Sequence, residues 1–394
     1  SLTYGIFYLC RLNISIALPE IGREFNSSKT LLGGIGSSFF ILYSLGQFIN
    51  GHLGDRVSPR LLILTGLVVS SFLNIAVGLS PSILVIVILW GANGYFQSMA
   101  WGPSVKILAS WFPLKERGKI SGFQAFFYQG GNVASWIIAG YLAQKLGWRW
   151  AFFIPAIVLL FTGIYFFNRV RNNPRQINLA IPWKNSSTSR QEVKSIFRQS
   201  IGNPRILKVA ISFFFLSITS YSLLFWLPSY LVSSEKASIS LAAYRSVILP
   251  ISGAVSALFT GWMTDRLFSS RRAPLAIIML TISLPLVLIF PYIPSITGKL
   301  VSLFLLGLLI YGPHMLMVGT MPMDYATEKA ASSAAGFIDS LGYLGATVGG
   351  IGTGLIIDYF SWDKVFIFYG ISIFLSLVCL FSEKIPRRRE ERAF

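Results

Sequence analysis

Long apolar runs separated by short polar segments form the dominant pattern along this chain of 394 residues. A helix needs about 20 apolar residues to cross the hydrocarbon layer of a membrane, because every backbone N–H and C=O has to pair within the segment. The pattern therefore predicts an all-α membrane protein with twelve transmembrane helices. The predicted helices span residues 2–20, 31–53, 61–79, 82–111, 119–144, 149–168, 206–231, 240–263, 274–290, 299–324, 331–357 and 364–382.

The charge content agrees with this pattern. Charged residues make up 12% of the chain, whereas a soluble domain carries roughly 25%. The net charge of +18 would suggest nucleic acid as the partner of a soluble protein, but the basic residues lie between the apolar runs. The partners we expect are membrane lipids and not nucleic acid. Cys10 and Cys379 lie inside apolar runs and are expected to be free thiols.

The basic residues also predict the orientation. On the side that holds both termini 23 of them lie between the predicted helices, against 7 on the other side. The positive-inside rule places both termini in the cytoplasm, as expected for a multi-pass protein of a cell membrane. The predicted units are a six-helix bundle at 1–168, a basic cytoplasmic linker at 169–205, a second six-helix bundle at 206–383 and a basic cytoplasmic tail at 384–394.

The two predicted bundles repeat each other. An even number of helices in each makes the repeats parallel, and two such bundles can rock about a site near the membrane midplane. The sequence displays no catalytic cluster, so we expect neither an enzyme nor a cofactor. Two motifs recur 210 residues later: Gly51-His-Leu-Gly-Asp55-Arg56 as Gly261-Trp-Met-Thr-Asp265-Arg266, and Trp101-Gly102-Pro103 as Tyr311-Gly312-Pro313. Two more recur after 214 residues: Gly122-Phe123 as Gly336-Phe337, and Trp148 as Trp362.

The pattern G-x-x-x-D-R-x-x-x-R at Gly51 to Arg60, with its echo at Gly261 to Arg271, resembles the signature of the major facilitator superfamily. More narrowly, the chain resembles the organophosphate:phosphate antiporters. The motifs that carry this resemblance are Asn93-Gly94, Gln97-Ser98-Met99, Trp101-Gly-Pro, Trp111-Phe112-Pro113 and Tyr311-Gly-Pro-His. This resemblance covers the chain except the linker. It implies two pseudo-symmetric bundles, a monomer, and alternating-access transport of a small organic anion, a phosphate ester or a sugar acid, with inorganic phosphate as a counter-substrate.

Arg11 is the leading candidate for anion binding. An arginine at bilayer depth costs from about 3 to over 10 kcal/mol unless it faces protein or water. The first predicted helix holds no carboxylate before Glu20, so a substrate anion could be the partner, held through two hydrogen bonds. The alternative is an arginine that extends toward the membrane surface. The family resemblance favours the first interpretation, since it implies a phosphate held on a first-helix arginine.

Two other positions depart from the family pattern. Pro19 corresponds to Pro228 in the repeat, which makes Ser220 the counterpart of Arg11. Phosphate carriers of the family have a second arginine there, and its sugar-phosphate carriers usually have a lysine in place of Gln47.

Lys106 is a candidate replacement cation or a loop-anchoring residue, and His314 is a candidate for titration or for packing. Further candidates to line the cavity are Tyr8, Tyr43, Tyr128 and Tyr221.

Asp339 lies within a predicted helix and could carry a coupling proton or pair with an interior cation. The related proton-coupled sugar-acid carriers have acidic residues where Cys10 and Gln97 stand here, so we expect anion exchange. A proton-coupled sugar-acid symporter and a transport-deficient sensor remain alternatives.

The repeated loops are expected to act in gating. Asp55 and Asp265 can cap a neighbouring helix and pair with Arg60 or Arg271, and each contact would bias the two-state equilibrium by about 1–2 kcal/mol. The alternative is ordinary anchoring of the loops. The predicted gating residues are Asp55, Arg56, Arg60, Asp265, Arg266 and Arg271.

Overall fold

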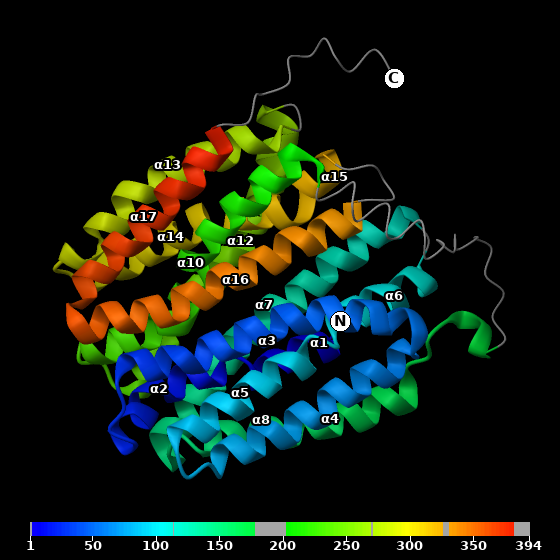
Figure 1. Cartoon of the computed structure of the whole chain (residues 1–394), viewed down its shortest axis with the longest axis horizontal. Helices are drawn as coiled ribbons and strands as arrows, with labels where there is room; N and C mark the ends of the chain where they lie inside the picture. The colour runs from blue at the N-terminus through cyan, green and yellow to red at the C-terminus, as the bar shows by residue number, and fades with distance from the viewer. Residues whose placement is uncertain (1, 113, 178–201, 269–270, 326–330, 382–394) are drawn as a thin grey trace.

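The computed structural model describes residues 2–112, 114–177, 202–268, 271–325 and 331–381, and these are helical apart from short connections. The predicted fold class is confirmed: the described helices form two bundles, with the N-terminal one in the lower part of Figure 1 and the C-terminal one above it. Within these described ranges, eleven helical segments are long and apolar enough to cross a membrane. Helix α7 covers the remaining predicted span, 119–144.

The N-terminal bundle contains α1 (Leu2–Phe7), the 3-10 turn η1 (Tyr8–Cys10), α2 (Asn13–Glu24), α3 (Lys29–Arg56), α4 (Pro59–Gly78), α5 (Ile83–Gln97), α6 (Trp101–Trp111), α7 (Leu114–Leu146) and α8 (Trp150–Arg169). A short turn, η2 (Pro174–Ile177), follows. The C-terminal bundle contains α10 (Pro204–Ser233), α11 (Ile239–Ser246), α12 (Ile248–Leu267), α13 (Arg272–Ile289), η3 (Phe290–Tyr292), α14 (Ile296–Met315), the π-helical turn η4 (Leu316–Thr320), α15 (Met321–Tyr325), α16 (Ala331–Tyr359) and α17 (Trp362–Phe381).

Four of the predicted spans are interrupted rather than continuous. The predicted helix 82–111 is divided into α5 and α6, and the second piece begins just before Pro103, whose ring cannot continue the preceding hydrogen-bonding pattern. The predicted helix 299–324 contains the π-helical turn after Pro313. The predicted helix 240–263 is interrupted at Val247, and the predicted helix 2–20 is interrupted at Arg11 and Leu12. The last of these interruptions forms the candidate site.

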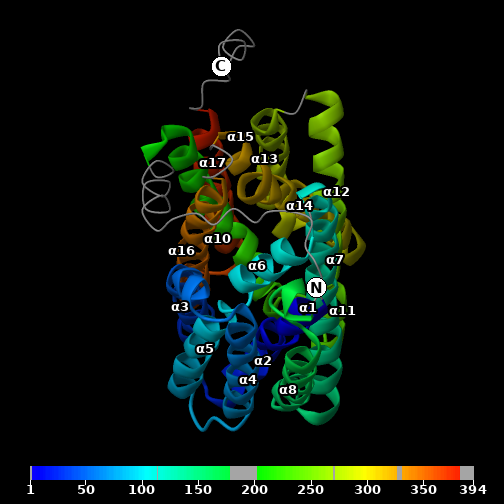
Figure 2. The same cartoon turned by 90° about the vertical axis from the view of Figure 1, so that its right-hand side faces the viewer.

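Helices α3 and α16 lie side by side along the boundary between the bundles, as both views show (Figures 1 and 2). They run antiparallel, and small residues bring their backbones close together. Ser37 Oγ donates to the carbonyl of Thr347 at 2.6 Å and accepts from the N–H of Ile351 at 3.0 Å. Gly33 faces the backbone of Gly350 so closely that a methyl group at Gly33 would clash with that carbonyl. Contacts of this closeness require both glycines.

We call the end of the bundles where α8 stops and α10 starts the linker end, and the opposite end the distal end. At the distal end Asp358 of α16 caps the first turn of α3 in the other bundle. Its carboxylate accepts from the N–H of Lys29 at 2.8 Å, from the N–H of Thr30 at 2.7 Å and from Thr30 Oγ1 at 2.6 Å. The positive end of the helix dipole favours a carboxylate there. The cap therefore fastens the two bundles together at the distal end.

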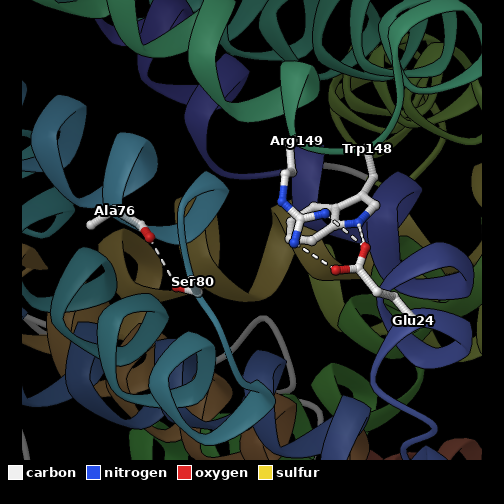
Figure 3. Close-up of polar contacts among 5 residues, drawn as sticks. All are labelled: Glu24, Ala76, Ser80, Trp148 and Arg149. Carbon is white, nitrogen blue, oxygen red and sulfur yellow. Dashed lines mark hydrogen bonds and ion pairs between the residues drawn. The ribbon is translucent and has the colours of Figure 1, made fainter.

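A separate ion pair fastens the distal end within the N-terminal bundle. Glu24, at the end of α2, accepts two hydrogen bonds from the guanidinium of Arg149, at 2.7 and 2.5 Å (Figure 3). Trp148 Nε1 donates to the same carboxylate at 2.8 Å. The C-terminal bundle has an equivalent pairing between Lys299 and Glu235. In both bundles a distal cation thus has a protein carboxylate as its partner.

Candidate anion-binding site

The interruption of the first transmembrane helix places Arg11 in the interior of the N-terminal bundle. The turn η1 ends at Cys10 and α2 begins at Asn13, so the carbonyl of Cys10 is left without its usual helical partner. That carbonyl accepts from Gln97 Nε2 at 2.8 Å, from Asn93 Nδ2 at 3.1 Å and from Asn74 Nδ2 at 3.4 Å. Side chains from α4 and α5 therefore satisfy the backbone where the helix is interrupted.

The guanidinium of Arg11 is only partly satisfied by the protein. Its Nε donates to Gln97 Oε1 at 2.8 Å and its Nη1 donates to the hydroxyl of Tyr8 at 2.9 Å. Its Nη2 is buried and has no hydrogen-bond partner in the described part of the chain, and no described carboxylate forms an ion pair with it. A buried cation with a free donor is costly, so this arrangement favours the binding of an anion.

Aromatic rings surround the same guanidinium. Its carbon lies 4.4 Å from the ring centroid of Tyr8, 4.5 Å from that of Tyr43 and 5.4 Å from that of Phe39. Such contacts stabilise a cation without neutralising it. Arg11 is 8% exposed, which is inconsistent with a side chain that extends to the membrane surface.

The aromatic surface continues into the C-terminal bundle. The ring centroids of Tyr43 and Tyr343 are 4.6 Å apart across the boundary, and those of Tyr343 and Tyr221 are 5.2 Å apart. The ring centroid of His314 lies 5.6 Å from that of Tyr221. The Nδ1 of His314 lies 3.4 Å from the hydroxyl oxygen of Ser220. Ser220, the predicted counterpart of Arg11, thus lies beside His314 and Tyr221. The C-terminal bundle has a hydroxyl at the position where the N-terminal bundle has the guanidinium of Arg11.

Asp339 extends the site toward the linker end. Gln47 Nε2 of α3 donates to Asp339 Oδ2 of α16 at 3.3 Å, which joins the two bundles. Asp339 is partly exposed, and no described cation forms an ion pair with it. The ring of Tyr128 lies 4.7 Å from that of Tyr8, which contacts Arg11. The expected pairing of Asp339 with an interior cation is thus replaced by an amide contact.

The remaining predicted residues lie elsewhere. Lys106, on α6, has an exposed side chain. Arg60 donates to the carbonyl of Phe167 within its own bundle, Arg266 lies 5.9 Å from the ring of Trp262, and Arg271 is exposed at the start of α13. The side chains of the other predicted gating residues, Asp55, Arg56 and Asp265, lie outside the described part of the structure.

Several members of the site were not predicted from the sequence. Gln97 and Asn93 lie one helical turn apart on α5 and both contact the interrupted helix. Their spacing of four residues in an apolar run was the available signal, since it places two amides on one helix face. Tyr343 and Phe39 carried no such signal, because aromatic residues are frequent throughout the chain. Among the described residues no three His, Cys, Asp or Glu side chains gather in a way that could hold a metal ion.

The chain is similar to known proteins along most of its length. A family model described as the Major Facilitator Superfamily matches residues 1–350. The glycerol-3-phosphate transporter of Bacillus subtilis (strain 168) is 29% identical over 96% of this chain and 89% of its own length. The membrane sensor protein UhpC of Escherichia coli (strain K12) is 26% identical over 96% of this chain and 89% of its own. The inward-facing, unoccupied structure of a bacterial homologue of the human lysosomal transporter Spinster has a TM-score of 0.83 at 16% identity, covering 96% of this chain and 95% of that one.

Proposed function

Because this chain belongs to the Major Facilitator Superfamily, we propose that it is a secondary active transporter of a small organic anion, a phosphate ester or a sugar acid, and that it works by alternating access with anion exchange. The observation that carries this proposal is the buried Nη2 of Arg11, which has no acceptor in the described part of the chain. An anionic oxygen at that nitrogen would complete the charge of the guanidinium.

Exchange, rather than proton symport, is supported by the groups beside Arg11. Gln97 occupies the position next to the guanidinium and uses both ends of its amide, since Oε1 accepts from Arg11 and Nε2 donates to Cys10. An amide cannot carry a proton at this position. Inorganic phosphate is the counter-substrate that we propose, because the resemblance to the organophosphate:phosphate antiporters implies it.

The proposal includes the setting of the protein. The linker end faces the cytoplasm together with both termini, because the basic residues gather on that side. The chain acts as a monomer surrounded by membrane lipids. It catalyses no covalent reaction, and each bundle contributes one face of the substrate cavity.

A sensor with the same fold is the second candidate, because the chain is about as similar to the membrane sensor protein UhpC as to the glycerol-3-phosphate transporter. Both candidates would bind an anion at Arg11. They differ in whether the occupied site then opens to the other side.

Counterflow in proteoliposomes separates the candidates. Vesicles that contain the purified full chain are preloaded with glycerol 3-phosphate, gluconate or inorganic phosphate and then given a trace of the labelled compound. We expect accumulation of label with at least one of these anions, also when a protonophore has collapsed the pH gradient. Binding without accumulation would support the sensor, and accumulation that requires the pH gradient would support proton symport.

A further inference from the structure

The candidate site contains an acidic group as well as a basic one, and the proposed function so far uses only the basic one. Arg11 lies in the N-terminal bundle, and Asp339 lies in the C-terminal bundle nearer the linker end. No ion pair joins the two groups in the described part of the chain. Each is therefore an incompletely balanced charge at membrane depth, where such residues mark substrate pathways.

Asp339 is held in place by a neutral partner. Gln47 donates one hydrogen bond to Oδ2 at 3.3 Å, and this contact fixes the carboxylate without compensating its charge. Gln47 uses one acceptor position of Oδ2, and no described cation forms an ion pair with Asp339, so the carboxylate can accept from a further donor. A group that brought a positive charge to this position would form a charge-assisted hydrogen bond, which is stronger than a bond from a neutral donor.

The surroundings of Asp339 are suited to a cation. Tyr343 lies one helical turn after Asp339 on α16, and its ring centroid lies 4.6 Å from that of Tyr43. The rings of Tyr221 and Tyr343 are 5.2 Å apart, and Tyr43, which Tyr343 contacts, lies 4.5 Å from the guanidinium carbon of Arg11. Aromatic rings near a carboxylate favour an ammonium group, because the aromatic quadrupole attracts positive charge.

We propose that the preferred substrate is a zwitterion, a small anion that also carries an amine, with its anionic group on Arg11 and its ammonium group at Asp339. This inference rests on the proposed function, since it assigns the second end of the same substrate. It names a narrower class than phosphate esters or sugar acids in general. The anionic group is a phosphate monoester or a carboxylate, and the ammonium group lies a few bonds away.

Matched pairs of ligands test the inference. Binding of 2-aminoethyl phosphate is compared with that of 2-hydroxyethyl phosphate, and 3-aminopropanoate with 3-hydroxypropanoate, by calorimetry on the purified full chain. We expect the amine of at least one pair to bind about tenfold more tightly than its hydroxyl analogue, and the pair that binds identifies the anionic group. In D339N we expect this preference to fall to about onefold, while the hydroxyl analogue binds as in the unmodified chain.

Controls separate this result from a general effect of charge or folding. Asp339→Glu should restore most of the preference, and Asp363→Asn, which removes an exposed carboxylate on α17, should leave the preference unchanged. If both members of a pair bind equally and R11K abolishes both, the zwitterion is overturned while the proposed function stands. Equal loss of both ligands in D339N would also overturn it, because Asp339 would then act on the fold or on the anion. Failure of both pairs to bind overturns the zwitterion, and the counterflow experiment with its other anions then decides the proposed function separately.

Discussion

Two arginines of the N-terminal bundle differ in how their charge is balanced. Arg149 lies at the distal surface, where Glu24 accepts two of its hydrogen bonds. Arg11 lies in the centre, is 8% exposed, and has an amide, a phenol and ring faces around it but no described carboxylate in ion-pair contact. The arginine at the surface, where solvent already stabilises its charge, has a carboxylate partner. The buried arginine has none among the described residues. This contrast supports our proposal that Arg11 binds a ligand, whereas Arg149 stabilises the structure.

The largest expected effect comes from exchanging each arginine for lysine. R11K keeps the positive charge but loses the planar fork of donors, so we expect anion exchange to fall by about 100-fold or more. R149K should change the rate by less than about twofold, because its partner is at the surface. The measurement is the initial rate of counterflow, normalised to the amount of protein in the vesicles.

Folding has to be checked for both variants by size-exclusion chromatography and thermal unfolding. Exchange by R11K at the rate of the unmodified chain, with normal folding of both proteins, would remove Arg11 from the site.

A smaller effect is expected at the backbone contact between the bundles. In G33A the added methyl group would clash with the carbonyl of Gly350 while the distal end is closed, and overpacking of this kind costs about 1–3 kcal/mol. The equilibrium should shift toward the state that is open at the distal end, and exchange should fall roughly tenfold. Spin labels on the exposed distal residues Leu79 and Tyr292, measured by pulsed electron paramagnetic resonance, report the opening.

The adjacent glycine provides the control, because a methyl group at Gly34 would meet no described atom within 4 Å. G34A should therefore keep the distance distribution and the rate of the unmodified chain. Equal behaviour of G33A and G34A would show that the close contact does not control opening.

A smaller effect still is expected for the helix cap at Asp358. Asn keeps an acceptor but loses the charge, and loss of a cap costs about 0.5–2 kcal/mol. D358N should increase the population that is open at the distal end by about fivefold, measured with the same pair of labels. D363N removes a carboxylate from the same end without such a contact and should have no effect. A closed population that is unchanged in D358N would mean that the cap does not hold the bundles together.

The smallest effect is expected for the ion pair at the surface. Both side chains are more than a third exposed, at 38% for Arg149 and 39% for Glu24, so solvent screens the pair. E24Q should lower the free energy of unfolding by less than about 1 kcal/mol and leave exchange unchanged. A large loss of exchange in E24Q would contradict the assignment of this pair to structure alone.

The sequence was sufficient for the arrangement of spans, because hydropathy reports directly on the solvent around each helix. It also identified Arg11 and Asp339, since a charge within an apolar run stands out. The interruption at Arg11 could not be found in the same way, because Cys10-Arg11-Leu12 contains neither Gly nor Pro. That interruption is stabilised by amides from α4 and α5, and contacts between distant segments are not visible in local patterns.

The contacts between the two bundles could not be predicted from the sequence either. The chain contains 35 glycines, and nothing in the sequence distinguishes Gly33 and Gly350 as partners. Only the antiparallel register of α3 and α16 brings them together. The same register places Gln47 beside Asp339, which replaced the expected ion pair with a neutral contact.

The most direct test of the central claim is to locate a bound anion. Crystals of the full chain grown with selenate, a tetrahedral dianion, are measured by anomalous diffraction at the selenium edge. We predict an anomalous peak whose selenate oxygens lie within hydrogen-bond distance, about 3 Å, of Arg11 Nη2, and no such peak in R11Q crystals. A selenate bound only at the distal surface, for example beside Arg23 and Lys29, with none at Arg11, would contradict the claim.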